Sequence, residues 1–148
     1  MNILQVIKGG MNIFKIFDPL YYASCKTFMR SGNFHNPLTA GYWLTGMVEL
    51  LFILSILLFL LGCFSINLHT DNNMVRRISG AIIIILFLKF DDLLRSFHAK
   101  RHKEIMKKYS FINSQFTCWM IHLVYEIAIV AIVILSGMFW NFRVSGHI

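Results

Sequence analysis

Long apolar stretches separated by short polar ones are the main pattern of this chain. The first stretch, 41–64, has an apolar centre that is interrupted only by Ser55. The last stretch, 118–140, carries Trp119 and Trp140 near its ends, where membrane-spanning helices concentrate aromatic residues. A helix that crosses a bilayer needs ~20 mostly apolar residues. Both stretches are therefore predicted to span a membrane.

A third and shorter apolar run, 81–88, lies between these two and is followed at once by charged residues. We predict a membrane span over 78–94, and we expect its helix to continue as a basic segment to about residue 108. This span is the weakest of the three, because three charges fall inside it: Lys89, Asp91 and Asp92.

Two amphipathic segments precede the spans. In a helix over 3–17, the polar side chains would share one narrow strip, which is typical of a helix that lies in a membrane interface. Asp18 and Pro19 favour the start of a second helix, 19–31, with an apolar stripe that contains two tyrosines. We expect this helix to contact the membrane too; the alternative is that it lies on the protein's own surface.

Composition supports the membrane assignment and adds an orientation. The chain of 148 residues is 57% hydrophobic and 14% charged, whereas a soluble domain is ~25% charged. The net charge of +7 would suggest nucleic acid in a soluble protein. Here basic loops that stay in the cytoplasm explain it, so a nucleic-acid partner is not expected.

The basic residues concentrate before the first span and between the second and third. The positive-inside rule therefore places the N-terminus in the cytoplasm and the C-terminus outside, with a bacterial inner (plasma) membrane as the expected location. The basic residues on the cytoplasmic side are expected to contact anionic lipid: Lys8, Lys15, Lys26, Arg30, Arg95, Lys100, Arg101, Lys103, Lys107 and Lys108.

The strongly ionisable groups of the spans all fall in their cytoplasmic halves. A charge near the centre of a span costs at least ~2.5–3.5 kcal/mol, so such groups should face each other rather than lipid. We expect an intramembrane polar cluster, with Lys89 as the simplest partner for the two glutamates. Its members are Glu49, Lys89, Asp91, Asp92, His122 and Glu126.

Three interpretations of this cluster remain open. It can fix how the helices assemble, it can form a proton or ion site or the mouth of an oligomeric pore, or its span-two members can simply lie among lipid headgroups.

Sequence motifs for chemistry are weak. The three cysteines are widely spaced and form no C-x-x-C pair, so neither a redox motif nor a metal site is suggested. Arg30 with His35, and Arg95 with His102, fit a loose spacing found in nucleotide-cleaving sites, but such matches are expected by chance in a basic chain. Only His122 lies clearly within a span, so haem is not expected, and no cofactor is predicted.

The sequence therefore predicts an all-α integral membrane protein with three transmembrane helices preceded by one or two interfacial amphipathic helices. We expect one membrane domain over 1–148. The expected function is that of a non-enzymatic accessory or oligomeric subunit, which binds another membrane protein or a second copy of itself. A pore-forming or membrane-disrupting effector and a lipid-directed membrane enzyme are the alternatives.

Overall fold

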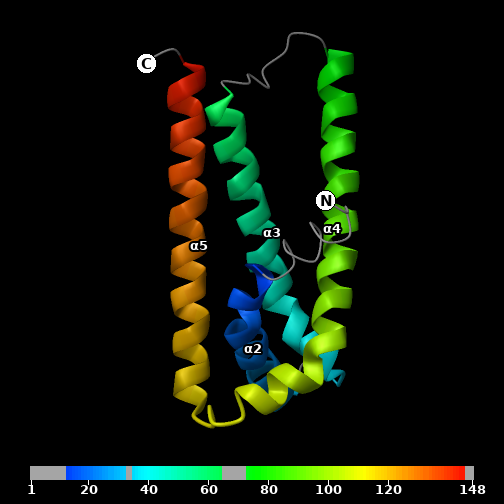
Figure 1. The fold of residues 1–148 in the computed structure, drawn as a ribbon, viewed down its shortest axis with the longest axis vertical. Helices are drawn as coiled ribbons and strands as arrows, with labels where there is room; N and C mark the ends of the chain where they lie inside the picture. The colour runs from blue at the N-terminus through cyan, green and yellow to red at the C-terminus, as the bar shows by residue number, and fades with distance from the viewer. Residues whose placement is uncertain (1–12, 33–34, 65–72, 146–148) are drawn as a thin grey trace, which may run out of the picture. The chain divides into compact units, whose positions relative to one another are not determined.

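The computed structural model describes residues 13–32, 35–64 and 73–145, and within them every regular element is helical. A short 3-10 helix, η1 (Phe14–Phe17), precedes four α-helices. These are α2 (Asp18–Arg30), α3 (Pro37–Cys63), α4 (Asn73–Lys108) and α5 (Gln115–Val144) (Figure 1). The predicted all-α class is confirmed. Most of the predicted interfacial helix 3–17, including Lys8, lies outside the described residues.

The helix ends follow from local sequence. Pro19 lies in the first turn of α2, where its missing N–H costs nothing. Gly32, just beyond the end of α2, has a φ of 72°, the left-handed conformation that glycine adopts most readily after a helix. At the start of α3, the side chain of Asn36 accepts a hydrogen bond of 2.9 Å from the backbone N–H of Leu38.

Two of the described helices, α3 and α5, are long and apolar enough to cross a membrane. Only 28% of the most apolar part of α3, and 17% of that part of α5, is buried within the structure. The core helix of a soluble protein would be mostly buried, so both helices are compatible with a membrane protein. Helix α4 covers the expected third span, but the stretch 78–95 contains four charged residues and is not shown to be a span: Lys89, Asp91, Asp92 and Arg95.

The chain divides into two compact units, and each long helix contributes to both. Unit 1 comprises 1–49 and 93–126, and unit 2 comprises 50–92 and 127–148. In unit 2, the rings of Phe59 and Phe139 stack with centroids 5.2 Å apart. A Cβ atom added to Gly62 would lie 2.7 Å from the ring of Phe139, so the glycine permits this close approach of α3 and α5.

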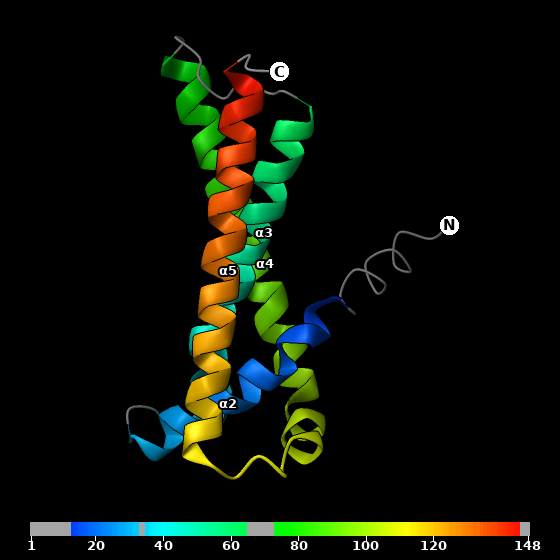
Figure 2. The same ribbon diagram turned by 90° about the vertical axis from the view of Figure 1, so that its left-hand side faces the viewer.

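In unit 1, the N-terminal two-thirds of α2 is enclosed by the rest of the unit. Every residue from Leu20 to Cys25 is buried. Figure 2 shows α2 running obliquely past the N-terminal turns of α5, and Phe28 of α2 stacks on His122 of α5 with ring centroids 6.1 Å apart. The apolar stripe of α2, with its two tyrosines, faces the protein itself, which was the alternative interpretation of this helix. Tyr21 and Tyr22 are fully buried, because their stripe packs against the protein itself.

Candidate functional site

A carboxylate and an imidazole form the centre of the candidate site in unit 1. Oε1 of Glu49, on α3, lies 2.7 Å from Nε2 of His98, on α4. The side chains are 0% and 1% exposed, respectively. Enclosed acidic groups require a hydrogen-bonded partner, because desolvation of an unpaired charge is costly. The pair therefore connects α3 to α4 at a position that water does not reach.

Tyr21 of α2 extends this pair into a cluster of four residues. Its ring stacks on the imidazole of His98, with centroids 4.8 Å apart and an interplanar angle of 6°. Its hydroxyl lies 3.0 Å from Nδ1 of His102, one turn further along α4. We call Tyr21, Glu49, His98 and His102 the buried polar cluster; the first three are buried and His102 is half-buried.

Burial sets the protonation of the tyrosine and one histidine in the cluster. Desolvation raises the pKa of Tyr21, so its phenol keeps its proton and donates to the ring nitrogen of His102. Desolvation also lowers the pKa of His102, which favours the neutral ring that can accept this hydrogen bond.

Space for Tyr21 depends on a glycine of α3. A Cβ atom added to Gly41 would lie 2.6 Å from an atom of the Tyr21 ring, which is closer than carbon atoms can approach. The tyrosine ring therefore occupies the volume that a side chain at residue 41 would take.

An ion pair between α2 and α4 lies in the same unit. Two guanidinium nitrogens of Arg101 donate hydrogen bonds of 2.8 and 2.7 Å to the two carboxylate oxygens of Asp18, which is fully buried. Burial alone would lower the pKa of Arg101, but the hydrogen bonds and the charge of Asp18 outweigh it, and the pKa is raised. This paired geometry is the strong form of an arginine–carboxylate contact.

A second histidine, on α5, also packs against α2. His122 is 2% exposed, and its Nε2 lies 3.4 Å from the hydroxyl oxygen of Ser24. Phe28 stacks on its ring, and Trp119 meets it edge-on at 5.6 Å. Through these residues and those of the buried polar cluster, α2 contacts all three long helices within unit 1.

The residues predicted for one intramembrane cluster have different environments. Glu49 and His122 are buried in unit 1, where Glu49 has His98 as its partner. Glu126 also belongs to unit 1, but its side chain is exposed. The other three belong to unit 2: Lys89 and Asp92 are exposed, and Asp91 is half-buried.

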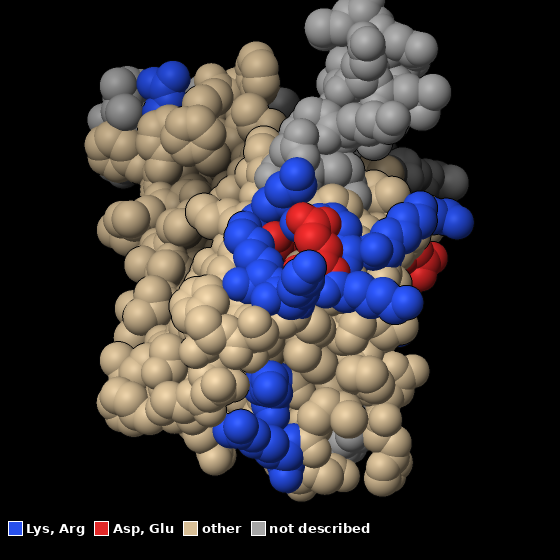
Figure 3. All heavy atoms as spheres, turned by 60° about the horizontal axis from the view of Figure 1, so that its bottom comes forward, with Lys and Arg blue, Asp and Glu red and all other residues tan. Residues whose placement is uncertain are grey.

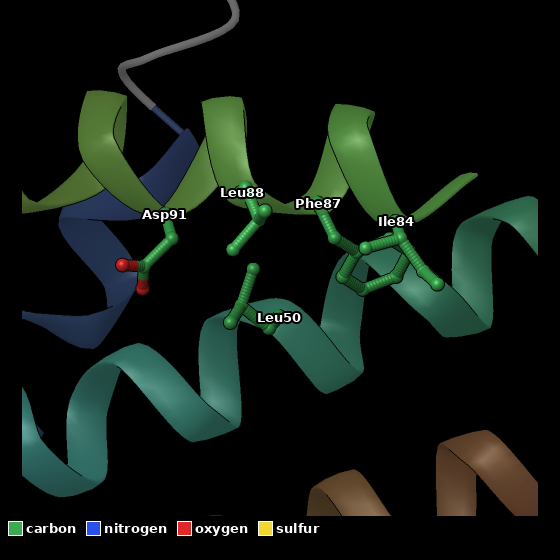
Figure 4. Close-up of a pocket in the computed structure, with 5 residues that line it drawn as sticks. All are labelled: Leu50, Ile84, Phe87, Leu88 and Asp91. Carbon is green, nitrogen blue, oxygen red and sulfur yellow. The ribbon is translucent and has the colours of Figure 1, made fainter. Parts of the chain in front are cut away.

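Asp91 lines a hollow of about 320 Å³ in unit 2 with four apolar residues. Figure 4 shows Leu50 of α3 pointing toward Leu88 of α4 there. Apart from Asp91, the lining is apolar: Leu50, Ile84, Phe87 and Leu88.

The residues predicted to contact anionic lipid are mostly accessible. Among those that the structure describes, Lys26 and Arg101 are half-buried, and Arg101 is held by Asp18. Figure 3 shows Lys and Arg side chains gathered on one face, with Asp and Glu side chains among the largest group of them. The others are exposed: Lys15, Arg30, Arg95, Lys100, Lys103, Lys107 and Lys108.

Sequence reasoning missed His98 and Tyr21. His98 lies within the basic segment of the sequence, but Leu94, His98 and Ile105 share one buried stripe of α4. Their spacing of four and seven residues is the helical repeat that would have placed this histidine on the inner face. No comparable signal separates a tyrosine packed in the protein from one at a membrane interface.

The arrangement of the buried polar cluster is suited to holding helices together. Nδ1 of His98 is buried and has no hydrogen-bond partner among the described residues. The described residues contain no group of three or more histidine, cysteine, aspartate or glutamate side chains that could hold a metal ion.

Comparisons with protein-family models, curated proteins and solved structures found no match to this chain.

Proposed function

We propose that this protein is a non-enzymatic membrane subunit, held in the bilayer by its apolar helices and associated there with another transmembrane chain. The large apolar side chains that α3 and α5 leave exposed support the membrane location. They include Phe59 and Leu60 on α3, and Ile134, Leu135 and Met138 on α5. Monomeric soluble proteins rarely expose contiguous apolar surface of this kind.

Helix α4 provides the third crossing in this proposal. It has 36 residues, which at 1.5 Å per residue corresponds to roughly 54 Å, more than the ~30 Å of a hydrocarbon core. The remainder extends into the cytoplasm as the basic end of α4. The excess of basic residues before α3 and at this end supports a cytoplasmic N-terminus in a plasma membrane.

The main support for the proposed association is the environment of Glu126. It lies in the apolar helix α5, is exposed, and forms no ion pair or hydrogen bond with any described residue. Its neighbours one turn away on the same side, Leu123 and Val130, are exposed and apolar. A carboxylate facing lipid there would be costly, so we infer that a polar group of a second transmembrane chain covers it.

The buried polar cluster supports a structural role rather than a catalytic one. Neither the hollow beside Asp91 in unit 2 nor a hollow beside Cys25 in unit 1 has any of the cluster's four residues among the described residues of its lining. The cluster then holds α2 against α3 and α4, while the exposed surface of α5 provides the association.

The mass of the purified protein tests this proposal. We expect wild-type protein in mild detergent to run as an assembly, or to co-purify with a second membrane protein, and Glu126→Gln to release it as a monomer. Glu104→Gln is the matched control, since Glu104 is an exposed carboxylate of the basic end of α4. A wild-type protein that is monomeric and free of any partner contradicts the proposal.

A further inference from the structure

A hollow in unit 1 combines positive charge with apolar walls. It has a volume of about 360 Å³, within the ~300–1,000 Å³ range of small-molecule pockets. Its lining comes from α2, from the start of α3 and from the basic end of α4: Cys25, Lys26, Met29, Arg30, Pro37 and Met106.

The charged side chains of this hollow leave it with unbalanced positive charge. Lys26 and Arg30 are one helical turn apart, so their like charges repel each other by a few tenths of a kcal/mol. In the part of the chain that the structure describes, neither forms an ion pair: Lys26 lies 5.7 Å from the centre of the Tyr22 ring, and Arg30 donates to the backbone oxygen of Asn113 at 3.5 Å. Arg101, by contrast, has its charge balanced by Asp18.

The other described residues of the lining are mainly apolar, and none of them is an acid. Met29 and Met106 supply flexible walls, and the thiol of Cys25 donates a hydrogen bond of 3.4 Å to the carbonyl of Pro37. Burial raises the pKa of Cys25, while the charge of Lys26 acts in the opposite sense, so the thiol stays neutral and adds no negative charge.

From this geometry we propose that the hollow binds one anionic phospholipid, with Lys26 and Arg30 on the phosphate and the two methionines against the glycerol and upper acyl chain. An anion between the two cations removes their repulsion, and the apolar walls suit a ligand that has an apolar part next to its charge. The proposal rests on the membrane location argued above, which would bring the hollow within reach of lipid headgroups.

Native mass spectrometry of the full-length protein in detergent tests the site. We expect wild-type protein to retain one phosphatidylglycerol and to bind phosphatidylcholine much more weakly. The double variant Lys26→Gln, Arg30→Gln should bind phosphatidylglycerol about 10- to 30-fold more weakly, since each cation near an anionic lipid contributes ~1 kcal/mol. Lys103→Gln, Lys107→Gln is the matched control, because it removes the same charge from exposed positions of unit 1 outside the hollow.

Three results would overturn the proposal. One is equal loss of binding in both double variants, which would show a general effect of charge. Another is retention of phosphatidylglycerol by Lys26→Gln, Arg30→Gln. The third is displacement of the lipid by millimolar inorganic phosphate, which would identify a free phosphate site. Extraction of the protein from membranes by alkaline carbonate would instead contradict the proposed function, so the two failures can be distinguished.

Discussion

The ring of Tyr21 stacks on the imidazole of His98, and Nε2 of the same imidazole is hydrogen-bonded to Oε1 of Glu49. Helix α2 is thereby connected to both α3 and α4 through side chains that are fully or almost fully buried. These contacts join segments that are far apart in sequence, so the buried polar cluster holds α2, α3 and α4 together within unit 1.

Removal of either member of the Glu49–His98 pair should destabilise the protein strongly. Breaking a buried ionic or hydrogen-bonded pair typically costs ~3–5 kcal/mol, because an enclosed polar group then loses the short hydrogen bond that offset its desolvation. Glu49→Ala and His98→Ala should each lower the melting temperature in detergent, and the double variant should lose much less than the sum of the two. Additive losses would show that the two residues do not act as a pair.

Replacement of Arg101 by lysine should weaken the attachment of α2 even though the charge is kept. A lysine cannot form the two parallel hydrogen bonds that the guanidinium makes with Asp18. We expect ~1–3 kcal/mol of lost stability by chemical denaturation, in line with the worth of a charge-assisted hydrogen bond. Lys100→Arg is a control at the neighbouring exposed position, and an equal effect there would contradict this interpretation.

The close approach of Gly41 to Tyr21 predicts a position-specific response to alanine. Gly41→Ala should destabilise the protein by ~1–3 kcal/mol, because the new methyl group overlaps the tyrosine ring. Gly137→Ala offers a matched comparison, since no atom outside its own helix lies within 4 Å of a Cβ built there. That substitution should be neutral or stabilising by up to ~1 kcal/mol through helix propensity. Similar melting temperatures for both variants would be the contrary result.

The lowered pKa of His102 predicts a loss of stability in mild acid. Burial keeps the folded-state pKa below the ordinary value of 6.5, so in the interval below 6.5 the unfolded chain binds more protons than the folded one. Stability should therefore fall as the pH drops through that interval, and protonation should break the hydrogen bond from Tyr21. His102→Gln should flatten the pH dependence of the melting temperature relative to wild type. His35→Gln, at an exposed position, should leave the dependence as it is.

Helix locations could be predicted from the sequence because they depend on local patterns. The apolar stretches 41–64 and 118–140 overlap α3 and α5. The helix 19–31 was also predictable from Asp18–Pro19, but which surface covers its tyrosines was not. An apolar stripe packs equally well on lipid or on protein, and only the tertiary structure decides between them.

The candidate site was harder to predict, because the tertiary packing of the helices determines which side chain lies next to a buried polar group. The sequence indicates that Glu49 needs a partner, but charge alone predicts that this partner is Lys89. The structure gives it His98, a residue that can be neutral and that the basic sequence around it concealed. The exposure of Glu126 could not be predicted from the sequence either. The position of a residue along a helix indicates its depth in the membrane, but it does not show which neighbours cover its side chain.

The claim that a second transmembrane chain covers Glu126 can be tested most directly by photo-crosslinking in native membranes. A photoreactive residue at Leu123 lies one turn from Glu126 on the same side of α5, whereas one at Val124 lies roughly 160° away around the helix. Both positions are similarly exposed, at 49% and 58%. We predict a protein adduct from position 123 and lipid adducts alone from position 124. Lipid adducts alone from both positions would contradict the proposed association.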